Sequence, residues 1–150
     1  MAAGINIIRF LNQLTGGKLL AWKVVFATIV FALAGLQLVM AARFWGVTTF
    51  PPMKSGTAAR VHRYNGRLAL TMAVLVAFSC LVGPAGPTSP TRVLLHSIFG
   101  ALVFAVLAIK FALLKFLKSG QRMLPLVGVF LFLTFGAIWA TSVADYISTR

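Results

Sequence analysis

The two histidines of the chain, His62 and His96, are the residues best suited to chemistry, and each is followed by glycine four positions later. Four residues make about one helical turn, so Gly66 and Gly100 are expected to lie on the same helix faces as their histidines. Each glycine should leave a bare strip of backbone beside an imidazole, and a flat macrocycle needs such a gap. Because imidazole is a common axial ligand of haem iron, the repeated pattern predicts haem b at one or two sites, with His62 and His96 coordinating iron.

Basic residues accompany both histidines. Arg92 precedes His96 by one helical turn, and Arg63 and Arg67 are close to His62 in the sequence. Haem carries two carboxylates, which form strong charge-assisted hydrogen bonds with guanidinium groups. We therefore predict that Arg63, Arg67 and Arg92 take part in cofactor binding.

The same residues also have a plainer interpretation. A histidine within a turn of a membrane surface can hydrogen-bond to lipid headgroups or water, and glycine is common in membrane helices as a packing residue. This interpretation applies to His62 and to His96, and it predicts no cofactor.

The composition defines the class of protein that positions these histidines. Hydrophobic residues make up 60% of the 150 residues and charged residues 10%, which is far from the mix of a soluble domain. The apolar residues form four runs, each about long enough to cross a hydrocarbon core of roughly 30 Å as a helix. The runs show no alternation of polar and apolar residues, which argues against a β-barrel. The sequence predicts an all-α membrane protein, a four-transmembrane-helix bundle forming a single domain over residues 1–150, with spans near residues 19–42, 60–83, 93–116 and 124–145.

Residues 1–17 have a different pattern from the apolar runs. Ile7, Ile8, Leu11 and Leu14 recur at helical spacing with polar residues between them, which is typical of an amphipathic segment lying in the membrane interface. The pair of glycines at 16–17 is expected to end this segment. A disordered terminus is the alternative, and no cleavable signal peptide is expected because the first apolar run is too long for one.

The net charge of +13 comes from 14 Lys and Arg against one acid, Asp145. These basic residues lie mainly at the ends of the apolar runs, so they indicate membrane topology and anionic lipid as a partner, and we predict no nucleic-acid binding. The first and third connections carry the larger share of them. The positive-inside rule therefore predicts a multi-pass protein of the plasma (inner) membrane with these two connections in the cytoplasm and both termini outside.

Soluble-enzyme chemistry has little support in this sequence. There is no Glu, and the single Asp145 cannot form the carboxylate pair that acid–base catalysis uses. Metalloprotease, phosphate-loop and dinucleotide signatures are absent. The sequence favours an electron-transfer protein over a stand-alone enzyme and leaves enzymatic activity open.

The motif His62-Arg63-x-x-Gly66 at a helix start, followed by a second helix with His96-x-x-x-Gly100, resembles the helix motifs of the cytochrome b561 group of transmembrane haem proteins. The resemblance extends over about residues 61–115. It implies a four-helix core with histidine pairs from different helices, two b haems near opposite faces, and electron transfer across the membrane.

This sequence departs from that group in its number of histidines, since the core of the group uses four. The apolar runs that contain Gly35 and Gly136 have no histidine. Successive helices are antiparallel, so His62 and His96, each near the N-terminal end of its helix, should lie near opposite faces and roughly 20 Å apart. They cannot coordinate one iron together.

Three arrangements could supply the missing ligands. A homodimer could pair each histidine with its twin, so that each haem is shared between chains. A partner subunit of a larger membrane redox complex could provide them. Met40, which ends the first span on the face expected for His62, could act as a second axial ligand, although methionine more often serves as ordinary packing.

Two hypotheses about function follow from these residues. The first is a membrane-bound b-type cytochrome that carries electrons across or along the membrane, with quinol or within a redox complex; Gln37 or Asn65 could line a quinone site near the cytoplasmic face. The second is a cofactor-free accessory or structural subunit of a membrane protein assembly.

Overall fold

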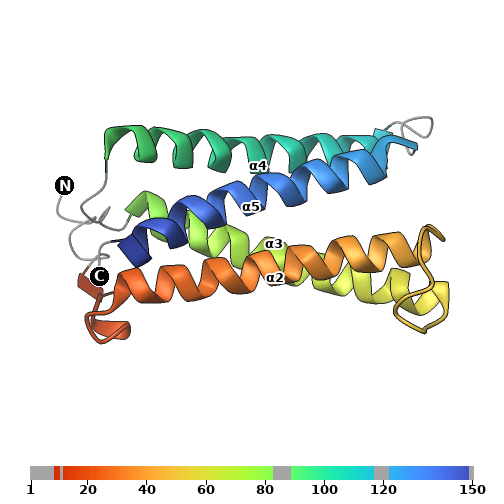
Figure 1. Ribbon diagram of the computed structural model, residues 1–150, viewed down its shortest axis with the longest axis horizontal. Helices are drawn as coiled ribbons and strands as arrows, with labels where there is room; N and C mark the ends of the chain where they lie inside the picture. The colour runs from red at the N-terminus through yellow and green to blue at the C-terminus, as the bar shows by residue number, and fades with distance from the viewer. Residues whose placement is uncertain (1–8, 11, 83–88, 117–121, 149–150) are drawn as a thin grey trace.

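A computed structural model of the chain contains four long helices that run side by side along its longest axis (Figure 1). It describes residues 9–10, 12–82, 89–116 and 122–148. The helices are α2 (Leu19–Phe44), α3 (Ser55–Val82), α4 (Pro90–Phe116) and α5 (Leu124–Ser148). No strand occurs within the described ranges. The prediction of an all-α four-helix fold is confirmed.

The helices extend beyond the apolar runs that predicted them. The largest difference is at α3, which begins at Ser55 and not near residue 60. Hydropathy marks only the part of a helix that suits hydrocarbon, whereas a helix can continue into the polar interface where water satisfies its terminal groups. Pro90 opens α4 three residues before the expected start, and proline is favoured at the first helical position because it lacks the N–H that would be unsatisfied there.

The N-terminal segment is helical where it is described. Residues 9–10 and 12–14 are helical, and residues 1–8 and 11 lie outside the described part of the chain. Gly16 and Gly17 follow with φ angles of 58° and 78°. This left-handed backbone conformation suits glycine, and the amide of Gly17 donates to the carbonyl of Asn12 over 2.8 Å. The two glycines therefore end the short helix before α2, as their sequence predicts.

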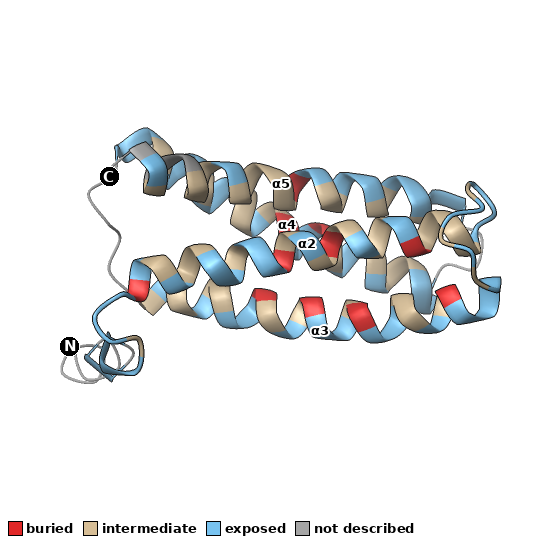
Figure 2. Ribbon diagram, turned by 60° about the horizontal axis from the view of Figure 1, so that its bottom comes forward, coloured by how far each residue is buried: buried red, intermediate tan, exposed pale blue. Residues whose placement is uncertain are grey.

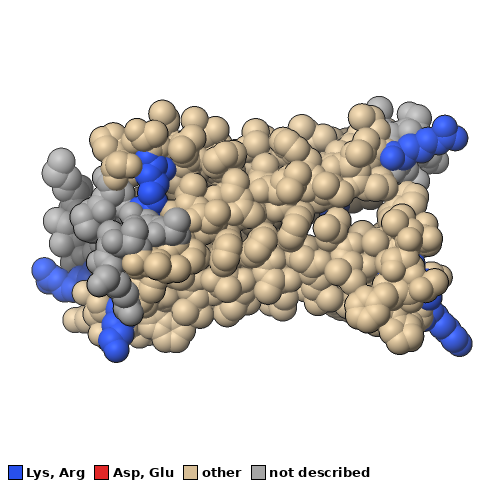
Figure 3. Space-filling model, in the orientation of Figure 1, with Lys and Arg blue, Asp and Glu red and all other residues tan. Residues whose placement is uncertain are grey.

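All four helices are long and apolar enough to cross a membrane. Most of their surface is exposed or only partly covered, and buried positions form short patches where helices meet (Figure 2). Figure 3 shows Lys and Arg at the two ends of the molecule and other residues along its middle. The distribution fits a lipid-facing surface between two polar interfaces.

The helices pack in the order α3, α2, α5, α4. Among the described residues, α2 forms interfaces with α3 and α5, and α5 packs against α4, whereas α3 and α4 share no comparable interface. The α2–α5 contact is aromatic: the Phe31 ring stacks on those of Phe132 and Trp139 at centroid distances of 5.2 and 5.1 Å. The Phe31 ring also approaches Gly136, where a Cβ would lie 3.5 Å from the ring, at ordinary van der Waals contact. Because α3 and α4 do not pack extensively on each other, space remains between them.

Small residues bring α3 close to α2. Ala58, Ala69 and Ala73 of α3 are buried, and so is Asn65. The Asn65 side chain donates from Nδ2 to the backbone oxygen of Leu33 over 2.8 Å. Small residues allow close backbone approach in membrane helices, and polar side chains then hydrogen-bond across the interface. This contact fixes the rotation of α3 and so the direction of the His62 side chain.

Candidate functional site

A cavity of about 580 Å³ lies between the helices near the end of the bundle where the first and third connections are found. Its walls come from α2, α3, α4 and α5, with Trp45 and Val47 of the first connection. Figure 3 shows a hollow between the two helix pairs at this end, on the right of the view. Small-molecule and cofactor sites have volumes of roughly 300–1,000 Å³ and mainly apolar walls. The cavity is therefore large enough for a cofactor.

His62 lies on the wall of this cavity, and its ring orientation is held by α2. The imidazole Nδ1 is 3.0 Å from the backbone oxygen of Gln37, which can only accept, so Nδ1–H donates. The edge of the ring meets Phe44 at a centroid distance of 5.3 Å. Histidines that bind metals commonly donate one ring N–H to a carbonyl, which leaves the other nitrogen for the metal. In the neutral ring, Nε2 of His62 carries that lone pair.

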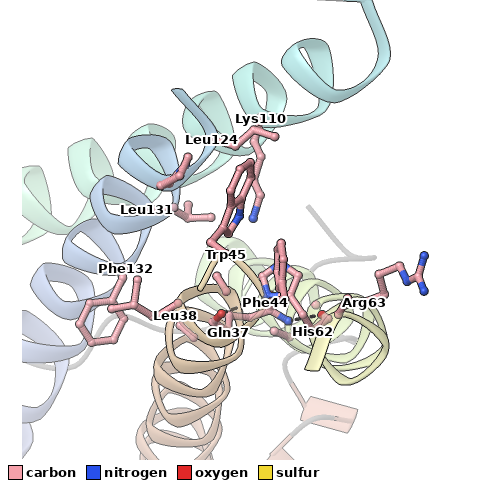
Figure 4. A pocket seen from close by; sticks show the side chains of 18 of the residues that line it. Gln37, Leu38, Phe44, Trp45, His62, Arg63, Lys110, Leu124, Leu131 and Phe132 are labelled. Carbon is pink, nitrogen blue, oxygen red and sulfur yellow. Dashed lines mark hydrogen bonds between the residues drawn. The ribbon is translucent and has the colours of Figure 1, made fainter. Parts of the chain in front are cut away.

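Two hydrogen bonds join Gln37 and His62, one donated by each side chain to the backbone of the other residue (Figure 4). While the ring of His62 donates to the backbone of Gln37, the amide Nε2 of Gln37 donates to the backbone oxygen of His62 over 2.6 Å. Gly66 makes room for this amide, because a Cβ at that position would lie 3.0 Å from Gln37 Nε2. The strip beside His62 is thus partly covered by Gln37, unlike the bare strip that the sequence led us to expect. The spacing of residues within one helix could not reveal a side chain contributed by its neighbour.

Arg63 and Arg67, the cations predicted near His62, differ in their position relative to the cavity. Arg63 lines the cavity. Arg67 is exposed, lies with its guanidinium carbon 5.9 Å from the centre of the Tyr64 ring, and is not among the residues that line the cavity. Of these two arginines, only Arg63 is among the cavity-lining residues, and its exposed side chain extends away from the other labelled ones (Figure 4).

Lys110 of α4 is a cavity residue that sequence reasoning missed. It lines the cavity together with His62 and comes from the opposite helix pair (Figure 4). The available signal was a lysine within an apolar span, since ionisable residues inside membranes usually face the protein interior or a polar pathway.

Met40 is 4% exposed and is not among the cavity-lining residues, although Gln37 and Ala41 of the same helix are. Its neighbours on α2 turn toward the cavity while its own side chain is packed. The placement favours the packing interpretation of Met40 over the role of second iron ligand.

The first connection forms the rim of the cavity. Arg43 donates from Nε to the backbone oxygen of Pro51 over 3.1 Å, and its Nη2 donates to the backbone oxygen of Met53. Gly46, with a φ of 77°, turns the chain at the end of α2. Trp45 then stands beside the cavity, which explains how a short connection contributes a wall.

His96 lies in a second polar cluster, between α4 and α5. Its Nδ1 is 3.4 Å from Thr141 Oγ1 and 3.5 Å from Ser142 Oγ. Both hydroxyls donate to backbone oxygens of their own helix, including that of Ile138, so each oxygen can accept from Nδ1–H. Arg92 joins the cluster by donating from Nε to the backbone oxygen of Thr141 over 2.6 Å. As at His62, groups of the neighbouring helix contact Nδ1 of the ring, so Nε2 remains for another ligand.

Gly100 matches the arrangement that its spacing from His96 predicts. A Cβ at Gly100 would meet nothing within 4 Å. The face of α4 one turn beyond His96 is therefore open, in contrast to the face at Gly66.

The two histidines lie at opposite ends of the bundle. His96 contacts α5 at Thr141, whereas His62 shares its cavity with Lys110, which is 14 residues after His96 on α4. Fourteen residues of helix span about 21 Å. Each histidine therefore belongs to a separate site. Within the described ranges, no three His, Cys, Asp or Glu residues cluster as a metal-binding group.

The fold and its surface define a multi-pass membrane protein with four membrane-spanning helices. The chain belongs to the family described as a family of unknown function (DUF6529), whose model matches residues 8–150. No curated protein and no solved structure matches the chain.

Proposed function

We propose that this protein is a membrane-bound b-type cytochrome that carries electrons across or along the membrane, with haem b in the cavity and His62 as an axial ligand. The observation that carries this proposal is the His62 imidazole on the cavity wall, whose Nδ1–H donates to the Gln37 carbonyl. That hydrogen bond sets the tautomer in which Nε2 can coordinate iron. Bound haem would supply one-electron chemistry.

The lining of the cavity fits the cofactor chemically. Most of the lining residues are apolar, and the polar ones include His62, Gln37, Arg63 and Lys110. A macrocycle needs apolar contact for its ring and a nitrogen donor for its iron, while its carboxylates need cations. The lining of the cavity includes residues of all three kinds: apolar side chains, an imidazole and a cation. The resemblance to the cytochrome b561 group supports the same proposal.

A second haem at His96 is part of the proposal. His96 has the same ring arrangement, with Nδ1 engaged by Thr141 and Ser142, and Gly100 leaves the adjacent surface open. Helix α4 packs mainly on α5, so much of the surface of α4 faces away from the bundle. A second copy of the chain, or another subunit of a redox complex, would complete this site.

A quinone site at Gln37 and Asn65 has less support. The amide of Gln37 donates to the His62 backbone, and that of Asn65 donates to the Leu33 backbone. Both donors therefore hold α2 and α3 together. A quinol partner would have to be bound by other groups of the cavity.

The proposed cofactor is tested by a visible spectrum of the purified protein after haem-replete expression. We expect a sharp Soret band and, after dithionite reduction, an α-band, because six-coordinate b haem absorbs strongly in both regions. The double variant His62→Ala/His96→Ala, purified from the same membranes, controls for loosely bound haem. A wild-type spectrum without these bands would contradict the proposal and favour a cofactor-free accessory subunit.

The proposed orientation places the first and third connections in the cytoplasm. Ser55 opens α3 at the cavity end, and Ser89 directly precedes α4 at the other end, and both are exposed. Cys80, the single cysteine of the chain, is exposed and must first be replaced by alanine. In that Cys80→Ala background, Ser55→Cys should resist a membrane-impermeant thiol reagent in intact cells, and Ser89→Cys should react. The opposite labelling pattern would invert the orientation and leave the four spans unchanged.

A further inference from the structure

Lys110 is a half-buried cation in the membrane-spanning helix α4. It lies six residues before the end of α4 at Phe116, about 9 Å from that end, and it lines the cavity. Figure 4 shows its side chain reaching from α4 toward the space beside Trp45. Within the described residues, its ammonium forms no hydrogen bond or ion pair. A charge in such a setting is costly unless an opposite charge or a hydrogen-bond acceptor accompanies it.

This chain has no carboxylate side chain that could accompany Lys110. Asp145 is the single acid in the sequence and belongs to the last turn of α5. That turn follows Thr141, the contact of His96, and so lies at the other end of the bundle. The separation along the helices exceeds the roughly 21 Å between His96 and Lys110. Arg63 also lines the cavity, but its exposed side chain extends away from Lys110 (Figure 4).

We infer that the cavity is a binding site for an amphiphile whose anionic group, a carboxylate or a phosphate, pairs with Lys110. The apolar body of the ligand lies along the side where α3 and α4 share no extensive interface. Haem propionates and the headgroups of anionic lipids both have this chemistry. The haem form of the inference rests on the proposed function, and the lipid form is independent of it.

The first arm of the test compares haem b with its dimethyl ester, which keeps the macrocycle and lacks both carboxylates. Lys110→Gln should weaken haem binding about tenfold and leave binding of the ester unchanged, because a hydrogen bond between charged groups is lost only for haem. Lys110→Arg should keep wild-type affinity. Lys115→Gln is the matched control, since Lys115 is on the same helix, is exposed beside Phe116 and does not line the cavity.

The second arm uses protein without haem in vesicles of phosphatidylglycerol or of phosphatidylcholine, followed by native mass spectrometry of retained lipid. If lipid is the occupant, the wild type and Lys115→Gln should retain phosphatidylglycerol in preference to phosphatidylcholine, and Lys110→Gln should lose that preference. Circular dichroism of each variant checks that the helices are intact. A wild type that binds no haem but shows this lipid preference would contradict the proposed cytochrome and support the anion site.

Two results would overturn the inference. In the first, Lys110→Gln behaves as Lys115→Gln does in both arms, which would mean that Lys110 reaches the membrane surface and needs no bound anion. In the second, haem becomes high-spin in both Lys110→Gln and Lys110→Arg. Loss of the low-spin state despite a retained positive charge would make Lys110 an iron ligand.

Discussion

Replacing His62 with alanine should remove haem from the cavity while haem at the His96 end remains. The substitution removes the imidazole on the cavity wall, and no other histidine lies at that end of the bundle. If both ends bind haem, the ratio of haem to protein should fall by about half, because each iron depends on its own histidine. Pyridine haemochrome analysis of the purified variant measures this ratio.

The loss must be separated from damage to the fold, because His62 also joins α3 to α2 through its hydrogen bond to the Gln37 backbone. Added imidazole should restore part of the low-spin spectrum of His62→Ala, since the free ligand can enter the space that the side chain leaves. Tyr64→Ala is the matched control: Tyr64 is on the same turn of α3 but is 65% exposed. Unchanged haem content in His62→Ala would rule out His62 as a ligand.

Replacing His96 with alanine should remove the other haem independently, and Gly100→Leu should have the same effect with His96 intact. A Cβ at Gly100 meets nothing within 4 Å, so leucine should leave packing within the chain undisturbed and fill only the space beside the imidazole. We expect a loss of haem similar to that of His96→Ala, with a melting temperature close to that of the wild type. Gly100→Ala, which adds a single methyl group in the same place, is the control.

Independence is the outcome that discriminates between one site and two. If either alanine variant lost all haem while remaining folded, the two histidines would serve a single or strongly coupled site. A homodimer that shares both irons adds a further requirement, namely a haem content near one per chain. Two haems in a monomeric chain would require second ligands from residues other than Met40, which is packed away from the cavity.

The contrast between Gly66 and Gly100 shows where sequence reasoning about the site ends. Both glycines follow a histidine by one helical turn, and both were expected to leave a bare strip. The structure leaves that strip open at Gly100 and places the Gln37 amide against Gly66. The difference arises from the partner helices: α2 packs closely on α3 at Gly66, whereas no neighbouring atom lies within 4 Å of a Cβ placed at Gly100.

Lys110 and Met40 show the same limit for longer distances. Lys110 is 48 residues from His62 in the sequence, and only the packing order of the helices brings both to one cavity. Met40 and Gln37 both lie near the C-terminal end of α2. Gln37 lines the cavity, whereas Met40, three positions later, is buried and does not line it. Helical periodicity assigns a residue to a face, and the rotation of the helix against its neighbours decides what that face meets.

The sequence by itself determined the class of this protein. Four long apolar runs with basic ends suit a membrane, and in lipid the backbone of such a run must form its hydrogen bonds within its own helix. It also determined that His62 and His96 lie at opposite ends, since that follows from helix length and antiparallel succession. Only the tertiary structure decided that α3 and α4 stay apart and enclose a cavity between the helix pairs. Side chains at facing positions set those distances: alanines draw α3 onto α2, and the stacked rings of Phe31, Phe132 and Trp139 hold α5 against α2.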